Sequence, residues 1–201
     1  MTIPRSQKKA AKAFSLVELL VVISIIGLLA GLSSVAIPKA LEAGKKARAK
    51  GDLMAIVSAV KAYRQEYGRW PVLLPDGIDT EDSEAAGTYS WFDADNSKTL
   101  MKILTASPKD STGLNPKGIR FLEGPLEDGT FLDPWKTQYI VKLDTNESNS
   151  IEYWGEGNKP NISSTVIAIS YGPDKQMSNP TSTSTSTFDD VFSWEDRPWK
   201  K

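Results

Sequence analysis

Residues 12–22 read KAFSLVELLVV and open an apolar stretch, residues 14–37, in which Glu18 is the only formally charged side chain. A helix of about 24 residues is long enough to cross roughly 30 Å of hydrocarbon. The residues ahead of it form a basic segment without acids, containing Arg5, Lys8, Lys9 and Lys12. Such a flank is typical of the cytoplasmic side of a first membrane helix. The sequence therefore predicts a membrane span that carries one carboxylate, which costs free energy in lipid.

The helix is predicted to continue past the membrane span. After Pro38, apolar residues recur at three- and four-residue steps with polar residues between them. This stripe consists of Leu53, Ile56, Val57, Val60, Tyr63 and Tyr67. Gly68 and Pro71 follow in the order expected for a helix stop. We expect one helix over residues 14–67, apolar all round in its first half and amphipathic in its second.

The remaining chain predicts a small globular domain. A short helix is expected over residues 98–104, with Asn96 or Ser97 as its cap. Strands are expected over residues 119–122, 138–143 and 166–170, each bounded by Pro or Gly. The predicted fold class is α+β, a long N-terminal helix packed against a small antiparallel sheet. The predicted organisation is a basic leader (1–13), a membrane half-helix (14–37), an amphipathic half-helix (38–70) and a globular head (71–201).

Composition removes several classes of function. The chain of 201 residues contains no cysteine and no histidine, which excludes disulfides, thiolate zinc sites and Ser-His-Asp or Cys-His catalysis. No enzymatic activity is expected, because adjacent acids such as Asp189 and Asp190 point apart in an extended segment. The net charge of −1 gives no global electrostatic case for nucleic acid, and no such partner is expected. Binding of a hard cation stays open, because carboxylate and carbonyl oxygens can serve as its ligands.

The start of the apolar stretch resembles the signature of type IV pilin-like proteins: a basic leader, a small residue, Phe14, Glu18 as the fifth residue from Phe14 and a long apolar helix. The resemblance implies that a prepilin peptidase cleaves between Ala13 and Phe14 and that Phe14 is N-methylated. Ala13 stands where the family usually has glycine. The alternative is a secretory signal with a small-x-small site, cleaved after Ala36.

Three segments of the head resemble the major pseudopilins of type II secretion systems. They are Asp133-Pro134-Trp135 with Tyr139, the run from Ile169 to Asp174, and the run from Phe188 to Val191. The resemblance implies a calcium ion held by Asp174, Asp189 and Asp190, with carbonyls from Ser170 and Tyr171. The alternative is that these acids are solvated loop residues. A Ser/Thr repeat, residues 181–187, separates the two acidic runs.

The same resemblance implies a structural subunit that polymerises through its N-terminal helix into a secretion pseudopilus, which drives protein export across the outer membrane. Its partners would be further copies, minor pseudopilins and an inner-membrane assembly platform. Before assembly it would be a single-pass inner-membrane protein with a periplasmic head. Glu18 would pair with the amine of a neighbouring subunit.

Two other functions stay open from the sequence. One is a pilin of a surface or DNA-uptake filament. The other is a membrane-anchored periplasmic binding domain whose tryptophans stack on sugars. Its candidates are Trp70, Trp91, Trp154, Trp194 and Trp199. Tryptophans gathered on one exposed cleft would favour the binding domain, whereas tryptophans buried in the core would count against it.

Overall fold

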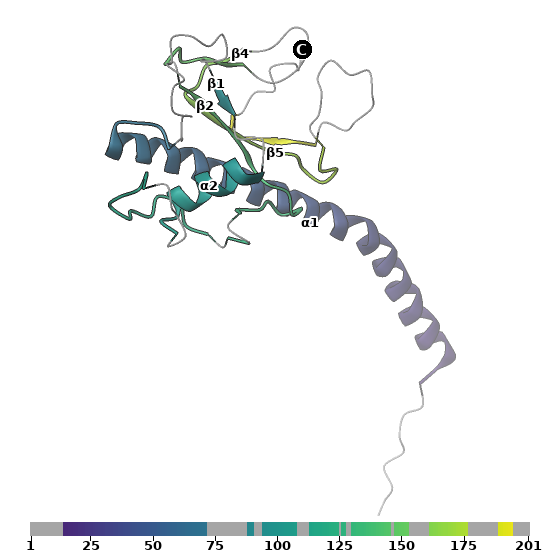
Figure 1. Ribbon diagram of the computed structural model, residues 1–201. Coiled ribbons are helices and arrows are strands. Elements are labelled where there is room, and N and C mark those ends of the chain that lie inside the picture. The colour runs from purple at the N-terminus through teal and green to yellow at the C-terminus, as the bar shows by residue number, and fades with distance from the viewer. Residues whose placement is uncertain are drawn as a thin grey trace, which may run out of the picture. The chain divides into compact units, whose positions relative to one another are not determined.

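The computed structural model describes residues 14–71, 88–90, 94–107, 113–124, 126–127, 130–145, 147–152, 161–176 and 189–194. The chain divides into two compact units, Met1–Gly44 and Lys45–Lys201. Its elements, seen in Figure 1, are α1 (Leu16–Tyr67), β1 (Thr88–Ser90), α2 (Ala94–Leu104), β2 (Ile140–Asp144), β3 (Ile151–Glu152), β4 (Asn161–Ile162), β5 (Val166–Ser170) and β6 (Val191–Phe192). The fold is the predicted α+β arrangement of a long N-terminal helix and a small antiparallel sheet.

Helix α1 contains 52 residues and runs through Pro38. In the first unit its large apolar side chains are exposed, with 81% exposure at Leu16 and 65% at Leu28. By length and composition it can cross a membrane. The helix ends where the sequence predicts: Gly68 has φ +67° and its N–H donates to the Arg64 carbonyl (2.8 Å). A left-handed glycine after the last turn satisfies a carbonyl that would otherwise lack a partner.

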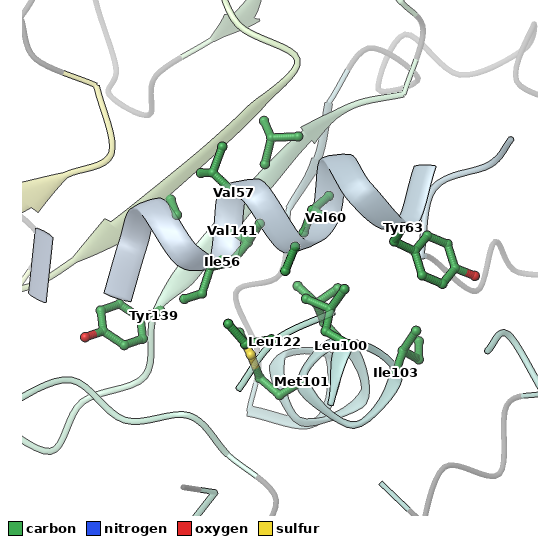
Figure 2. Close-up of a cluster of buried hydrophobic side chains, with 14 of the residues drawn as sticks. Ile56, Val57, Val60, Tyr63, Leu100, Met101, Ile103, Leu122, Tyr139 and Val141 are labelled. Atoms are coloured by element: carbon green, nitrogen blue, oxygen red, sulfur yellow. The ribbon is translucent and has the colours of Figure 1, made fainter. Parts of the chain in front are cut away.

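The second unit builds its core on the predicted stripe of α1. Leu53, Ile56, Val57, Val60 and Tyr63 are buried, and Figure 2 shows this face meeting α2 and β2. The partners on the other elements are Leu100, Met101, Ile103, Leu104, Val141, Leu143, Val166 and Ala168. Covering this apolar stripe with the head is what makes the second half of α1 stable in water.

The main sheet has four antiparallel strands in the order β1-β2-β5-β6, and β3 pairs with β4 in a second sheet. Its central pair aligns Ile140 with Ile169 and Leu143 with Val166. Alternate residues face opposite sides of a strand. Val141 and Val166 accordingly join the core on α1, whereas Ile140 and Ile169 join a second cluster with Phe192. The sheet is therefore buried on both faces along β2 and β5.

Two predictions about local structure were wrong. Helix α2 begins at Ala94, so Asn96 and Ser97 lie inside it rather than at its cap. Residues 119–122 form no strand, because the N–H groups of Phe121 and Leu122 both donate to the Leu104 carbonyl (2.8 and 3.0 Å). The segment therefore satisfies the C-terminal end of α2, where carbonyls lack helical partners. Leu122 is buried there at 2% exposure.

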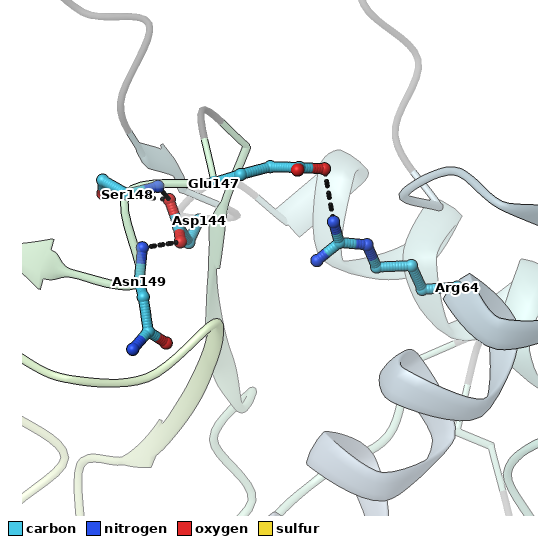
Figure 3. Close-up of polar contacts among 5 residues, drawn as sticks. All are labelled: Arg64, Asp144, Glu147, Ser148 and Asn149. Atoms are coloured by element: carbon cyan, nitrogen blue, oxygen red, sulfur yellow. Dashed lines mark hydrogen bonds and ion pairs between the residues drawn. The ribbon is translucent and has the colours of Figure 1, made fainter.

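The loop after β2 is held by a fully buried carboxylate (Figure 3). Asp144 accepts hydrogen bonds from the N–H groups of Ser148 (3.1 Å) and Asn149 (2.6 Å) and from the Ser148 hydroxyl. These bonds support positive φ angles at Glu147 (60°) and Asn149 (55°). Glu147 forms an ion pair with Arg64, whose guanidinium lies 4.1 Å from the centre of the Trp70 ring. The loop is thereby attached to the last turn of α1.

Candidate functional site

The N-terminal candidate site lies at the first turn of α1. Phe14 is 79% exposed, and Ala13 lies outside the described residues. The Ser15 N–H donates to Glu18 Oε2 (2.9 Å), and the Glu18 N–H donates to Ser15 Oγ (3.1 Å). This reciprocal pair is a capping box, in which side chains satisfy backbone donors that the helix cannot.

Glu18 therefore has a local role in addition to the assembly role implied by resemblance. A serine followed three residues later by glutamate, just before an apolar run, is the sequence signal of a capping box. Residues 15–18 read SLVE and contain that signal. The first turn fixes where the carboxylate sits relative to Phe14. Pairing of Glu18 with another subunit stays a prediction.

A second candidate site is an acidic cluster in the head, formed by Asp174, Asp189 and Asp190. Each offers a carboxylate oxygen, and these oxygens lie within 4.8 Å of one another. Asp189 is 9% exposed and Asp190 4%, while Asp174 is half-buried. Like charges at this separation repel strongly when water is excluded. The arrangement suits a hard cation, which takes carboxylate oxygens as ligands.

The turn after β5 brings the cluster together. Gly172 has φ +71°, and a Cβ on it would lie only 2.5 Å from the Asp189 carbonyl oxygen. Only glycine fits this conformation and this close approach. The Asp174 N–H then donates to Asp189 Oδ2 (3.3 Å). The turn and the segment before β6 are thus in backbone contact at the cluster.

Asp133 connects this turn to the Asp-Pro-Trp segment. Its buried carboxylate accepts the Ser170 hydroxyl (2.7 Å) and the N–H groups of Trp135 (3.0 Å) and Thr137 (2.8 Å). The Gly172 N–H in turn donates to Ser170 Oγ (3.2 Å). Two segments singled out in the sequence therefore share one hydrogen-bond network. Ser170, fully buried at the end of β5, uses its hydroxyl in this network, and a contribution of its carbonyl to a cation stays a prediction.

The electrostatics of the cluster disfavour the ionised form of Asp189. Burial raises the pKa of Asp189, the neighbouring charge of Asp174 raises it further, and Lys46 on α1 opposes the shift. Asp189 Oδ1 is buried and accepts no hydrogen bond from the residues that the structure describes. Burial, followed by the charge of Asp190, also raises the pKa of the half-buried Tyr171. A cation at the carboxylates would supply the partner that Asp189 Oδ1 lacks, so these residues fit a hard divalent ion.

The described tryptophans do not form a stacking surface. Trp70 and Trp135 are buried at 9% and 8% exposure, and Trp194 packs on Phe192 with ring centres 4.7 Å apart. Trp91, Trp154 and Trp199 lie outside the described residues. Among the described tryptophans, core packing therefore counts against a sugar-binding cleft.

Comparison with known proteins gives one match. Residues 8–34 match the prokaryotic N-terminal methylation motif. No curated protein and no solved structure matches the chain. The matched residues include the start of α1, whose apolar half suits a membrane anchor. The motif implies processing by a prepilin peptidase and filament assembly, and it supports a membrane-anchored, type IV pilin-like protein.

Proposed function

We propose that this chain is a pseudopilin, a structural subunit of a type II secretion pseudopilus. The observation that carries the proposal is the methylation motif over residues 8–34, which includes the start of a helix whose first half is exposed and apolar. A membrane covers that half before assembly, and neighbouring subunits cover it afterwards. The amphipathic half is already covered by its own head.

Polymerisation follows from repeating one contact. Cleavage between Ala13 and Phe14 creates a positive amine four residues from the Glu18 carboxylate, and N-methylation keeps that amine basic. Two opposite charges that are each costly in lipid neutralise one another when a subunit docks in register. Because the contact joins different surfaces of successive subunits, it generates a filament rather than a closed dimer. The subunit itself needs no catalytic residue.

The head favours a pseudopilin over a surface pilin. The Asp133 network joins two of the three segments that resemble major pseudopilins. The chain also has no cysteine, so it cannot close its C-terminal part with the disulfide that type IV pilins often have there. In this proposal the head is periplasmic, and the partners are further copies, minor pseudopilins and the inner-membrane platform. The filament drives protein export across the outer membrane.

Calcium belongs to the proposal as a structural ion. Asp174, Asp189 and Asp190 would hold it, with carbonyls of Ser170 and Tyr171 as further oxygen ligands. When bound, the ion neutralises the carboxylates and ties the turn after β5 to the segment before β6. A ligand that binds only the folded state stabilises it by mass action.

Whether the chain is a pilin-like protein can be tested by determining the N-terminus of the protein isolated from its own membrane fraction. Intact mass and N-terminal sequencing should give N-methyl-Phe14. A terminus at Ile37 would show signal-peptide cleavage and contradict the proposal. Deletion of the gene should then abolish secretion of exported proteins. Loss of a surface filament or of DNA uptake, with secretion unchanged, would instead identify a pilin.

A further inference from the structure

Lys50 joins α1 to the C-terminal segment of the head by two hydrogen bonds. Its half-buried ammonium donates to the carbonyls of Phe192 (2.7 Å) and Trp194 (3.1 Å), more than 140 positions along the chain. Hydrogen bonds from a charged donor are stronger than those between neutral groups. The Lys50 side chain therefore ties this short segment to the helix.

The two carbonyls lie on the outer edge of the sheet. Ser193, between them, donates its N–H to the Ala168 carbonyl on β5 (2.9 Å). Backbone groups of an extended segment alternate between its two sides, so the carbonyls at 192 and 194 point away from β5. The segment 191–194 is thus held by β5 on one edge and by Lys50 on the other.

This doubly held segment follows directly after two of the clustered carboxylates. Asp189 and Asp190 precede Val191, the first residue of β6, and Gly172 lies against the Asp189 backbone. Movement of β6 would therefore move two of the three carboxylates relative to Asp174. Holding ligands in place before the ion arrives reduces the ordering cost of binding.

We propose that Lys50 is a positioning residue for the cation site: it holds β6 on α1 so that Asp174, Asp189 and Asp190 converge, although it contacts none of their carboxylates in the described bonds. This inference rests on the proposed calcium site and adds to it a mechanical link with α1. Occupancy of the site and packing of the C-terminal segment on α1 are then one coupled equilibrium.

The positioning role predicts that replacing Lys50 weakens calcium binding, whereas the loss of its positive charge alone would not. The two effects can therefore be told apart. Lys50 is a cation on the same helix face as Lys46, four residues earlier. Removing a lysine charge from this face should leave the binding of another cation unchanged or strengthen it. Lys46 favours the ionised form of Asp189 and makes no hydrogen bond to a described residue. Lys46→Met is therefore the matched control, because it removes a nearby charge without releasing β6.

The experiment titrates CaCl2 into the full chain in detergent micelles, after removal of divalent ions, by isothermal calorimetry. Lys50→Met should weaken calcium binding by roughly tenfold, equal to about 1.4 kcal/mol, whereas Lys46→Met should leave it equal or tighter. Lys50→Arg, which keeps charged donors, should stay within about threefold of the parent. Binding by Lys50→Met as tight as the parent's, or tighter, would overturn the positioning role.

Two further outcomes are decisive. If circular dichroism shows that Lys50→Met is unfolded without calcium, Lys50→Gln replaces it, since the neutral, shorter amide cannot reproduce both charged hydrogen bonds to the carbonyls of Phe192 and Trp194. Undiminished calcium binding by Lys50→Gln equally overturns the role. If the parent shows no saturable calcium binding, this result contradicts both the proposed cation site and the positioning role. The filament proposal is then still judged separately, by the N-terminus at Phe14.

Discussion

Glu18 caps its own helix together with Ser15, and in the proposed filament it would also act between subunits. The capping box gives the carboxylate a partner in the single chain, from the Ser15 N–H. Assembly would offer it a charged partner instead, the amine of Phe14 on a neighbour. A carboxylate bonds more strongly to a cation than to a neutral donor. The exchange would favour the filament, while in the free subunit the carboxylate keeps the Ser15 N–H as a hydrogen-bond partner.

Substitutions at these two positions separate the two roles. Glu18→Val should leave membrane insertion and head stability unchanged but abolish or strongly reduce filaments, because the intersubunit charge pair is lost. Ser15→Ala removes one capping bond and should weaken the first turn by about 1 kcal/mol, while filaments still form. Filament yield by electron microscopy and membrane fractionation measure both. Normal filaments from Glu18→Val would refute the assembly role.

Gly172 is the residue at which a single methyl group should disturb the cluster. Gly172→Ala places a Cβ 2.5 Å from the Asp189 carbonyl oxygen at φ +71°, so strain and a backbone clash add. We expect a loss of roughly 2–4 kcal/mol in the free energy of unfolding. The matched control is Gly113→Ala, with φ +65° but no atom within 4 Å of its Cβ, which should cost only about 1 kcal/mol. Equal losses in urea denaturation would contradict the proposed close approach.

At the scale of elements, the amphipathic half of α1 is the support on which the head folds. Ile56 is fully buried in the core, whereas Met54 on the same helix is 47% exposed. Ile56→Ala should lower the free energy of unfolding by about 2–5 kcal/mol through lost burial and a cavity. Met54→Ala should change it by less than about 1 kcal/mol. Urea denaturation followed by tryptophan fluorescence measures both, and similar losses would argue against this helix face as the core.

The elements that the sequence predicts well carry their own periodicity. The stripe of α1 has helical spacing, and β2 and β5 are apolar runs bounded by turn residues, so each could be recognised locally. Strands β1, β3, β4 and β6 have two or three residues, too few for a pattern. Residues 119–122 have strand-like composition, but the end of α2 needs donors and takes their N–H groups. The contact with the end of α2 therefore outweighs the local strand propensity of residues 119–122.

The candidate sites were only partly predictable. The three carboxylates were singled out by resemblance, but their convergence depends on Gly172 approaching the Asp189 backbone, which no sequence spacing reveals. Lys50 could not be singled out from the sequence, because its carbonyl acceptors lie far along the chain. Ser15 was missed as a cap although the SLVE signal was present.

On the scale of the whole molecule, the two compact units differ in what their apolar surface requires. The first unit exposes its apolar side chains and needs lipid or neighbouring subunits. The second unit has its own core, and its stability should respond to a ligand that binds only when it is folded. Calcium and pH should therefore act on the melting of the head and leave membrane insertion unchanged.

Calcium should reverse the sign of the pH dependence that Asp189 contributes. In the calcium-free head its raised pKa means that the folded state holds more protons than the unfolded state, so this contribution to stability increases as pH falls through that pKa. With calcium bound, protons compete with the ion for the carboxylate, so acidification should lower stability. At calcium about 100-fold above its dissociation constant, the ion adds about 2.7 kcal/mol near neutral pH.

The measurement is thermal melting of the full chain in micelles across a pH series, in calcium and in chelator, compared with Asp189→Asn at each pH. The amide does not titrate, so the difference between parent and variant isolates Asp189 from the other acids. In chelator, the stability of the parent relative to the variant should increase as pH falls, because the ionised Asp189 is a costly buried charge. In calcium, it should decrease as pH falls, because the ionised Asp189 is a ligand of the ion. Melting temperatures that calcium does not shift would exclude the site, and parallel slopes in the two conditions would show that Asp189 is not a ligand.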